Sequence, residues 1–111
     1  MNCKLTSDSD TTRYGTKWGE GVTHEEPGGT LCGYGVLHYY ADPLLAVLFD
    51  SVHGNFRSNG RWHLWCVDDH DTMLDDDGTK RCCTKLTTLR RIPVPELTVA
   101  QRRLAREQGY A

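Results

Sequence analysis

The residue types best suited to chemistry lie close together in the segment 31–43. A thiol, Cys32, and an imidazole, His38, stand six residues apart in this segment, with two glycines between them. Glycine lets a backbone turn sharply or approach another group closely. A thiol and an imidazole brought together in this way are suited to metal binding or to nucleophilic chemistry.

Zinc binding is one alternative for this pair. Structural zinc sites are usually built from close pairs such as Cys-x2-Cys, and the sequence contains no such pair. We therefore expect no metal or other cofactor. A zinc-stabilised binding module, with Cys32 and His38 among the ligands, stays as an alternative.

A nucleotide-handling enzyme is a second alternative. A His-Tyr-Tyr element beside a short predicted helix resembles minimal ADP-ribosyltransferase-like folds, in which a His or Tyr contacts the cofactor and a Glu supports catalysis. The resemblance implies that His38 and Tyr40 line a pocket and that Glu20 is the acid–base group, with Glu25 and Glu26 as further candidates. No nucleophile elbow or phosphate-binding loop accompanies them, so the sequence favours a protein without catalysis.

Acidic residues gather in the segment 68–77, beside a chain end that is basic. Residues 1–78 hold five Lys and Arg against thirteen Asp and Glu, whereas residues 79–111 hold eight against two. Such charge separation is suited to a protein partner, because charge accelerates association. We expect partner contacts from the acidic segment and from two aromatic residues: Asp68, Asp69, Asp71, Asp75, Asp76, Asp77, Tyr34 and Tyr39.

The elements that must position these residues are short. Asp42 and Pro43 are typical of a helix start, and the apolar residues that follow predict a short buried helix at the centre of the core. Alternating apolar residues predict a strand over 61–67. The Asp-rich segment then turns at 75–78 and returns as a strand over 79–92, so 61–92 is expected to form an antiparallel hairpin or meander.

The two ends of the chain are expected to be peripheral. Residues 1–13 are polar without periodicity and are predicted to be flexible, which leaves 14–111 as a single domain. Thr98 and Gln101 form a capping box for a C-terminal helix that Gly109 ends. The expected fold is α+β: a small antiparallel sheet of four to six strands with one short buried helix and a peripheral C-terminal helix.

Composition limits the location and the partner. The first ten residues contain no apolar stretch typical of a signal peptide, and the longest apolar run is six residues, whereas a membrane span needs about 20. Five cysteines are an odd number, which favours reduced thiols in a cytoplasm. A pI of 6.2 argues against direct binding of nucleic acid.

Several motifs together resemble a known family. Cys-Gly-x-Gly-x-x-His at 32–38, the segment 18–24 before it and the segments 77–80 and 86–87 after it are similar to a family of small uncharacterised proteins of tailed phages. The resemblance covers most of 14–97 and implies a phage-encoded protein in the cytoplasm of the host cell. We expect an interaction protein that inhibits a host defence system, of the anti-CRISPR or another anti-defence type, by binding a host protein or protein complex.

Overall fold

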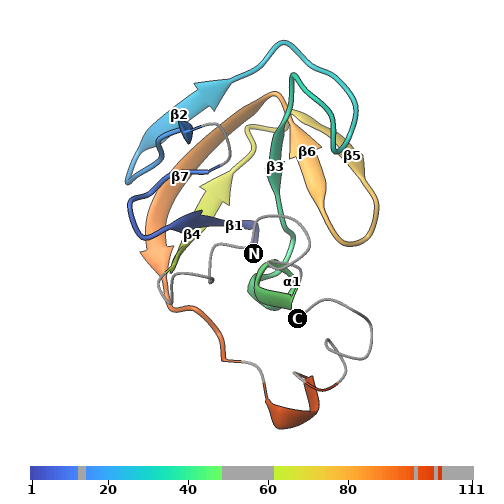
Figure 1. Cartoon of the computed structure of the whole chain (residues 1–111). Coiled ribbons are helices and arrows are strands. Elements are labelled where there is room, and N and C mark those ends of the chain that lie inside the picture. The colour runs from blue at the N-terminus through green and yellow to red at the C-terminus, as the bar shows by residue number, and fades with distance from the viewer. Residues whose placement is uncertain (13–14, 49–61, 97, 102, 104–111) are drawn as a thin grey trace.

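The computed structural model describes residues 1–12, 15–48, 62–96, 98–101 and 103, and shows two antiparallel sheets (Figure 1). The strands of the first sheet lie in the order β1 (Cys3–Ser7), β4 (Trp62–Asp68), β7 (Lys85–Ile92) and β2 (Val22–Glu25). The strands of the second lie in the order β3 (Leu37–Tyr39), β6 (Arg81–Cys83) and β5 (Met73–Asp76). The expected single sheet is thus divided into two.

The two sheets are connected at both sides. The chain passes from β4 into β5 through residues 69–72, and from β6 into β7 through Thr84, so one bent hairpin contributes to both sheets. On the opposite side, Cys3 of β1 and Tyr40 exchange two backbone hydrogen bonds of 2.8 Å. The expected pairing within 61–92 is present, because β4 pairs with β7 and β5 pairs with β6.

The core between the sheets takes residues from both of them. Its members are buried side chains of β3, β4, β6 and β7 together with one tryptophan that precedes β2: Trp18, Leu37, Tyr39, Trp65, Val67, Cys83 and Leu86. Trp65 donates its indole N–H to Thr6 Oγ1 at 3.0 Å, which satisfies a buried polar group. The aromatic residues therefore supply the burial that the few aliphatic residues do not.

The short helix α1 (Pro43–Leu48) begins where the sequence predicts, but it does not form the centre of the core. The backbone N–H of Leu44 donates to Asp42 Oδ1 at 2.7 Å, as expected for an N-cap. Ala46 is buried in a second cluster with Cys3 and Leu5 of β1, while Leu44 is exposed. The helix thus buries Ala46 and Val47 and packs against the second cluster, outside the cluster that lies between the sheets.

The N-terminal segment differs from the prediction, whereas the C-terminal capping box agrees with it. Cys3–Ser7 form an edge strand paired with β4 along its length, within the segment that we expected to be flexible. Residues 99–101 and 103 are helical, and Thr98 and Gln101 make both hydrogen bonds of a capping box, at 2.8 and 3.1 Å. The predicted end of this helix at Gly109 lies outside the described residues. The described chain is thus rich in sheet, with short helices.

Among the helices of the described ranges, none is long and apolar enough to cross a membrane.

The cap of α1 gives a first prediction. Asp42→Ala removes the acceptor for the Leu44 N–H and is expected to lower the free energy of unfolding by about 1 kcal/mol. Asp42→Asn keeps an acceptor oxygen at the same place and serves as the control, with little loss expected. Urea denaturation measures both; equal losses for the two variants would show that the cap is not the source of the stability.

Candidate functional site

The segment 28–35 is a tightly closed loop whose glycines are required by close contacts. Gly28 donates its N–H to the Gly35 carbonyl at 2.8 Å, which closes the loop at its base. A Cβ added at Gly35 would lie 2.5 Å from the Gly28 carbonyl oxygen, and Gly35 also has a φ of +80°. A Cβ at Gly29 would lie 2.1 Å from the backbone oxygen of Tyr34. The glycines of the motif thus have a structural role.

The loop brings Cys32 and His38 together, as the sequence suggests. The contact, however, is from the Cys32 backbone N–H to His38 Nε2, at 2.9 Å. A ring nitrogen that accepts a hydrogen bond uses the lone pair that a metal or a thiol proton would need, so the remaining ring proton lies on Nδ1. His38 therefore positions the loop in this structure.

The described residues show no group of three or more His, Cys, Asp or Glu side chains arranged to hold a metal ion. Cys82 lies directly opposite His38 in the β3–β6 pair and is fully buried, and burial is the main cause that raises the pKa of its thiol. A protonated buried thiol is a poor metal ligand and a poor nucleophile. Cys82 thus has the properties of a buried packing residue opposite His38.

The other two residues of the enzyme alternative lie elsewhere. Tyr40 uses its backbone in the bridge to Cys3, and its side chain is buried. Glu20 is exposed in the turn before β2, at the edge of the four-stranded sheet, whereas His38 is in the three-stranded sheet. The three residues do not share one sheet.

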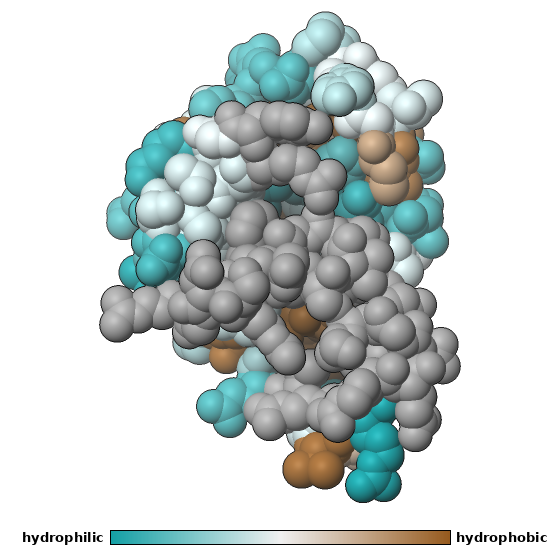
Figure 2. All heavy atoms as spheres, viewed as in Figure 1, coloured by the Kyte–Doolittle hydropathy of each residue, from teal (hydrophilic) through white to brown (hydrophobic). Residues whose placement is uncertain are grey.

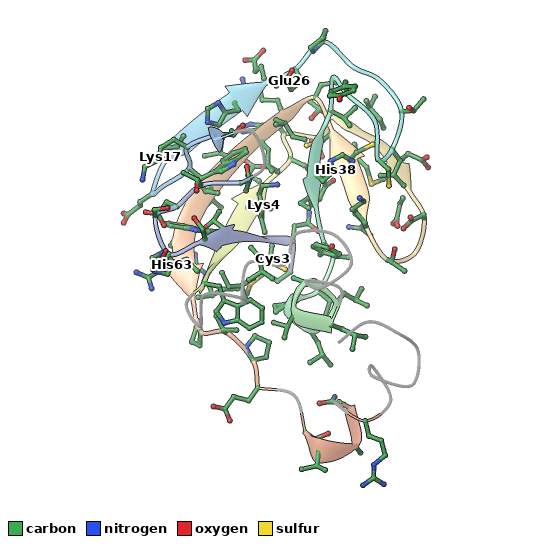
Figure 3. All side chains as sticks on the ribbon, in the orientation of Figure 1. Cys3, Lys4, Lys17, Glu26, His38 and His63 are labelled. Carbon is green, nitrogen blue, oxygen red and sulfur yellow. The ribbon has the colours of Figure 1, made fainter. Side chains whose placement is uncertain are left out.

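A polar group that the sequence did not reveal, Lys4, lies between the two sheets (Figure 3). Lys4 Nζ donates to the His38 carbonyl oxygen at 2.5 Å, and it lies 5.3 Å from the centre of the Trp18 ring. Burial lowers the pKa of this ammonium to about 8; the nearby Cys83 opposes the shift and Lys80 adds to it. A lysine in an N-terminal segment rich in polar residues gives no signal of burial, so sequence reasoning missed it.

Tyr39 and Asp69 form a second internal polar contact. Tyr39 is fully buried and donates its hydroxyl to Asp69 Oδ2 at 2.5 Å. Burial, followed by this contact with Asp69, raises the pKa of the Tyr39 hydroxyl. Tyr39 therefore does not present its side chain to a partner, contrary to the prediction, and Asp69 is already occupied within the fold.

The remaining aspartates of 68–77 lie at two places. Asp68 and Asp71 flank the turn between β4 and β5, where the His70 N–H donates to Asp68 Oδ1 at 2.9 Å. Asp75, Asp76 and Asp77 lie at the β5–β6 end, about 13 Å from Asp71 if an extended chain connects them. The predicted patch is thus two groups, separated along the chain by residues 72–74.

The carboxylates of Asp76 and Asp77 accept hydrogen bonds from backbone N–H groups of the turn between β5 and β6. Asp77 Oδ1 accepts the N–H groups of Thr79 and Lys80 at 2.9 and 2.8 Å, and hydrogen bonding, first from Lys80, lowers the pKa of Asp77 to about 2. Asp76 accepts from the Gly78 N–H and from Arg81 Nε, both at 2.9 Å, and these contacts lower its pKa. Both carboxylates remain exposed and charged at neutral pH.

Apolar side chains are exposed between the two acidic groups. Met73 and Leu74 of β5 are 48% and 50% exposed, and Tyr34 in the 28–35 loop is 84% exposed. The loop contacts β3 through the hydrogen bond from Cys32 to His38, and β6 lies between β3 and β5 in this sheet. A hydrophobic patch within hydrophilic surface is visible at the right edge of Figure 2, on the side where this loop, β5 and β6 lie in Figure 1.

Comparison of the chain with protein-family models, with curated proteins and with solved structures finds no match.

The loop geometry predicts a graded response to alanine. Gly35→Ala adds both a steric clash and an unfavourable φ, and is expected to lower the free energy of unfolding by about 2–4 kcal/mol. Gly78 has a φ of +87° but no atom within 4 Å of an added Cβ, so Gly78→Ala is the matched control for φ alone. Its expected loss is about 1 kcal/mol. Similar losses in urea denaturation would refute the close contact at Gly35.

The lowered pKa of Lys4 predicts a pH-dependent stability. Between pH 8 and 10.5 the unfolded chain keeps the Lys4 proton that the folded chain loses, so stability rises with pH in this window. The unfolding free energy of the natural chain minus that of Lys4→Met should therefore rise by about 1 kcal/mol from pH 7.5 to 9. The subtraction removes titrations that both proteins share. A difference that stays constant over this range would contradict a desolvated Lys4.

Proposed function

We propose that this chain is a small protein-binding module that uses its acidic β5 face to bind a basic partner surface. The observation that carries the proposal is the strand β5, in which all four residues are exposed and two of them, Met73 and Leu74, are large and apolar. Single exposed apolar residues are common on proteins. Two such residues in one exposed strand, with exposed carboxylates before and after them, combine apolar and charged side chains as interfaces commonly do.

Charge complementarity favours a basic partner. Asp71 and Asp75 flank the two apolar residues and are exposed, and neither of them forms an ion pair with a described residue. Exposed like charges on the rim attract an oppositely charged surface and raise its association rate. The same charges disfavour a second copy of β5 as the partner, because antiparallel pairing would bring two acidic strands together.

Recognition through side chains suits this strand better than addition of a further strand. A β-bulge interrupts the β5 register between Met73 and Asp75, and the Asp76 N–H already donates to Asp75 Oδ1 at 2.8 Å. Bulges and charges of this kind protect a sheet edge from pairing with another chain. The partner is therefore expected to contact the Met73 and Leu74 side chains and the carboxylates.

The biological setting in this proposal rests on the sequence resemblance alone. The resemblance to tailed-phage proteins supports a phage-encoded inhibitor of a host defence system, acting in the host cytoplasm on a host protein. In this proposal the two small sheets with α1 form an α+β frame for the acidic face. No observation favours the nucleotide-enzyme alternative enough to make it a second proposal, because the His38 Nε2 atom is already engaged.

A peptide-selection experiment tests the proposed surface. The immobilised full chain is used to select binders from a random displayed peptide library, and the selected sequences are expected to combine Lys or Arg with an apolar residue. The double variant Asp71→Asn/Asp75→Asn should bind these peptides at least about tenfold more weakly, with a reduced salt dependence. Asparagine keeps the shape and the acceptor oxygen that Asp75 uses, so the fold is expected to be preserved.

The matched control is Asp8→Asn/Glu26→Gln, which removes the same amount of charge from exposed residues outside 68–77. This variant should bind the selected peptides as the natural chain does. Selection of peptides without basic residues, or equal weakening by both double variants, would refute an acidic binding face on β5.

A further inference from the structure

Two cysteines of different strands, Cys3 of β1 and Cys66 of β4, lie directly opposite each other in an antiparallel pair. Both are free thiols. The neighbouring pairs in the same register are Lys4 with Trp65 and Leu5 with Leu64. Because side chains alternate between the faces of a sheet, Cys3 and Cys66 are on the same face as Leu5 and Leu64.

The backbone hydrogen bonds show which type of pair this is. Both the N–H and the carbonyl of Cys3 bond to Tyr40, on the side of β1 away from β4. The Val67 N–H donates to the Asn2 carbonyl at 3.0 Å, so the bonds between the strands are made one residue away. Cys3 and Cys66 are therefore a non-hydrogen-bonded pair, in which the α-carbons lie about 4.5 Å apart and the side chains approach most closely.

This spacing falls within the range of disulfide-bonded residues, whose α-carbons are about 4.4–6.8 Å apart. The two thiols also differ in access, since Cys3 is fully buried and Cys66 is partly exposed. We propose that Cys3 and Cys66 are a reversible disulfide site, closed by a small-molecule disulfide such as oxidised glutathione.

The reaction begins at the more accessible thiol. The Cys66 thiolate attacks one sulfur of oxidised glutathione, forms a mixed disulfide and expels one glutathione thiolate. The Cys3 thiolate then attacks the Cys66 sulfur, forms the Cys3–Cys66 bond and expels the second glutathione thiolate. Both expelled thiolates take up the protons that the two cysteines release, so two cysteine thiols are oxidised and one glutathione disulfide is reduced.

The surroundings of Cys3 make closure slow at neutral pH. Burial, and then the nearby Asp42 carboxylate, raise the pKa of the Cys3 thiol to about 12; Cys66 acts in the same direction and the α-amino group opposes it. The second step is therefore expected to accelerate as pH rises. The bond would connect β1 to β4 beside the Cys3–Tyr40 bridge, where the two sheets meet.

The experiment treats the purified full chain with glutathione buffers of increasing oxidised fraction and maps the cysteines by mass spectrometry after proteolysis. A Cys3–Cys66 linked peptide is expected, together with a rise of at least about 5 °C in Tm that dithiothreitol reverses. Cys66→Ser should abolish both effects. The matched control Cys32→Ser, which removes an exposed cysteine elsewhere, should keep both.

Three outcomes would overturn the proposal. Cys3 and Cys66 could remain alkylatable in oxidising buffer, glutathione could remain on Cys66 without closure, or the link could form between another pair such as Cys32 and Cys82. Cys3→Ala provides an independent check, since it should trap glutathione on Cys66 even if the Cys66→Ser variant folds poorly.

Discussion

A hydrogen bond from a desolvated lysine joins the two sheets beside the Cys3–Tyr40 backbone bridge. Lys4 of β1 donates to the His38 carbonyl of β3, and the His38 ring in turn accepts the Cys32 N–H of the 28–35 loop. A buried ammonium is unfavourable unless its partners are well placed, and Trp18 and the carbonyl supply them here. The position of the exposed loop thus depends on an interaction between the two sheets.

The aspartates of 68–77 serve the fold and the surface together. Asp69 binds the buried Tyr39 hydroxyl, and Asp77 binds the N–H groups of its own turn. Such contacts stabilise the charged form of the Asp77 carboxylate, as its pKa of about 2 indicates. Aspartates that fix the geometry of the turns therefore also supply negative charge at β5. The exposed Met73 and Leu74 belong to the same strand.

Local patterns predicted the local elements. The N-cap at Asp42, the strand predicted over 61–67 and the capping box at Thr98 depend on neighbouring residues, and the structure shows the N-cap, the capping box and a strand at Trp62–Asp68. The division into two sheets, the pairing of β1 with β4 and the packing of α1 against the second cluster depend on contacts distant in the sequence.

The candidate surface was predicted in part for the same reason. Its acidic residues are visible in the sequence. The burial of Tyr39 on β3 and the exposure of Leu74 on β5 depend instead on which faces of these strands other parts of the chain cover. Lys4 could not be identified, because alternation along β1 shows its face only once the strand itself is known.

The acidic face on β5 is tested most directly by mapping where a basic ligand binds. Amide chemical shifts of the isotopically labelled full chain would be recorded during titration with a short peptide of lysine and leucine residues. We expect the largest shifts at residues 71–77 and at Tyr34, and we expect them to disappear at high salt. Shifts concentrated on β2 or β7, or distributed evenly over the chain, would contradict it.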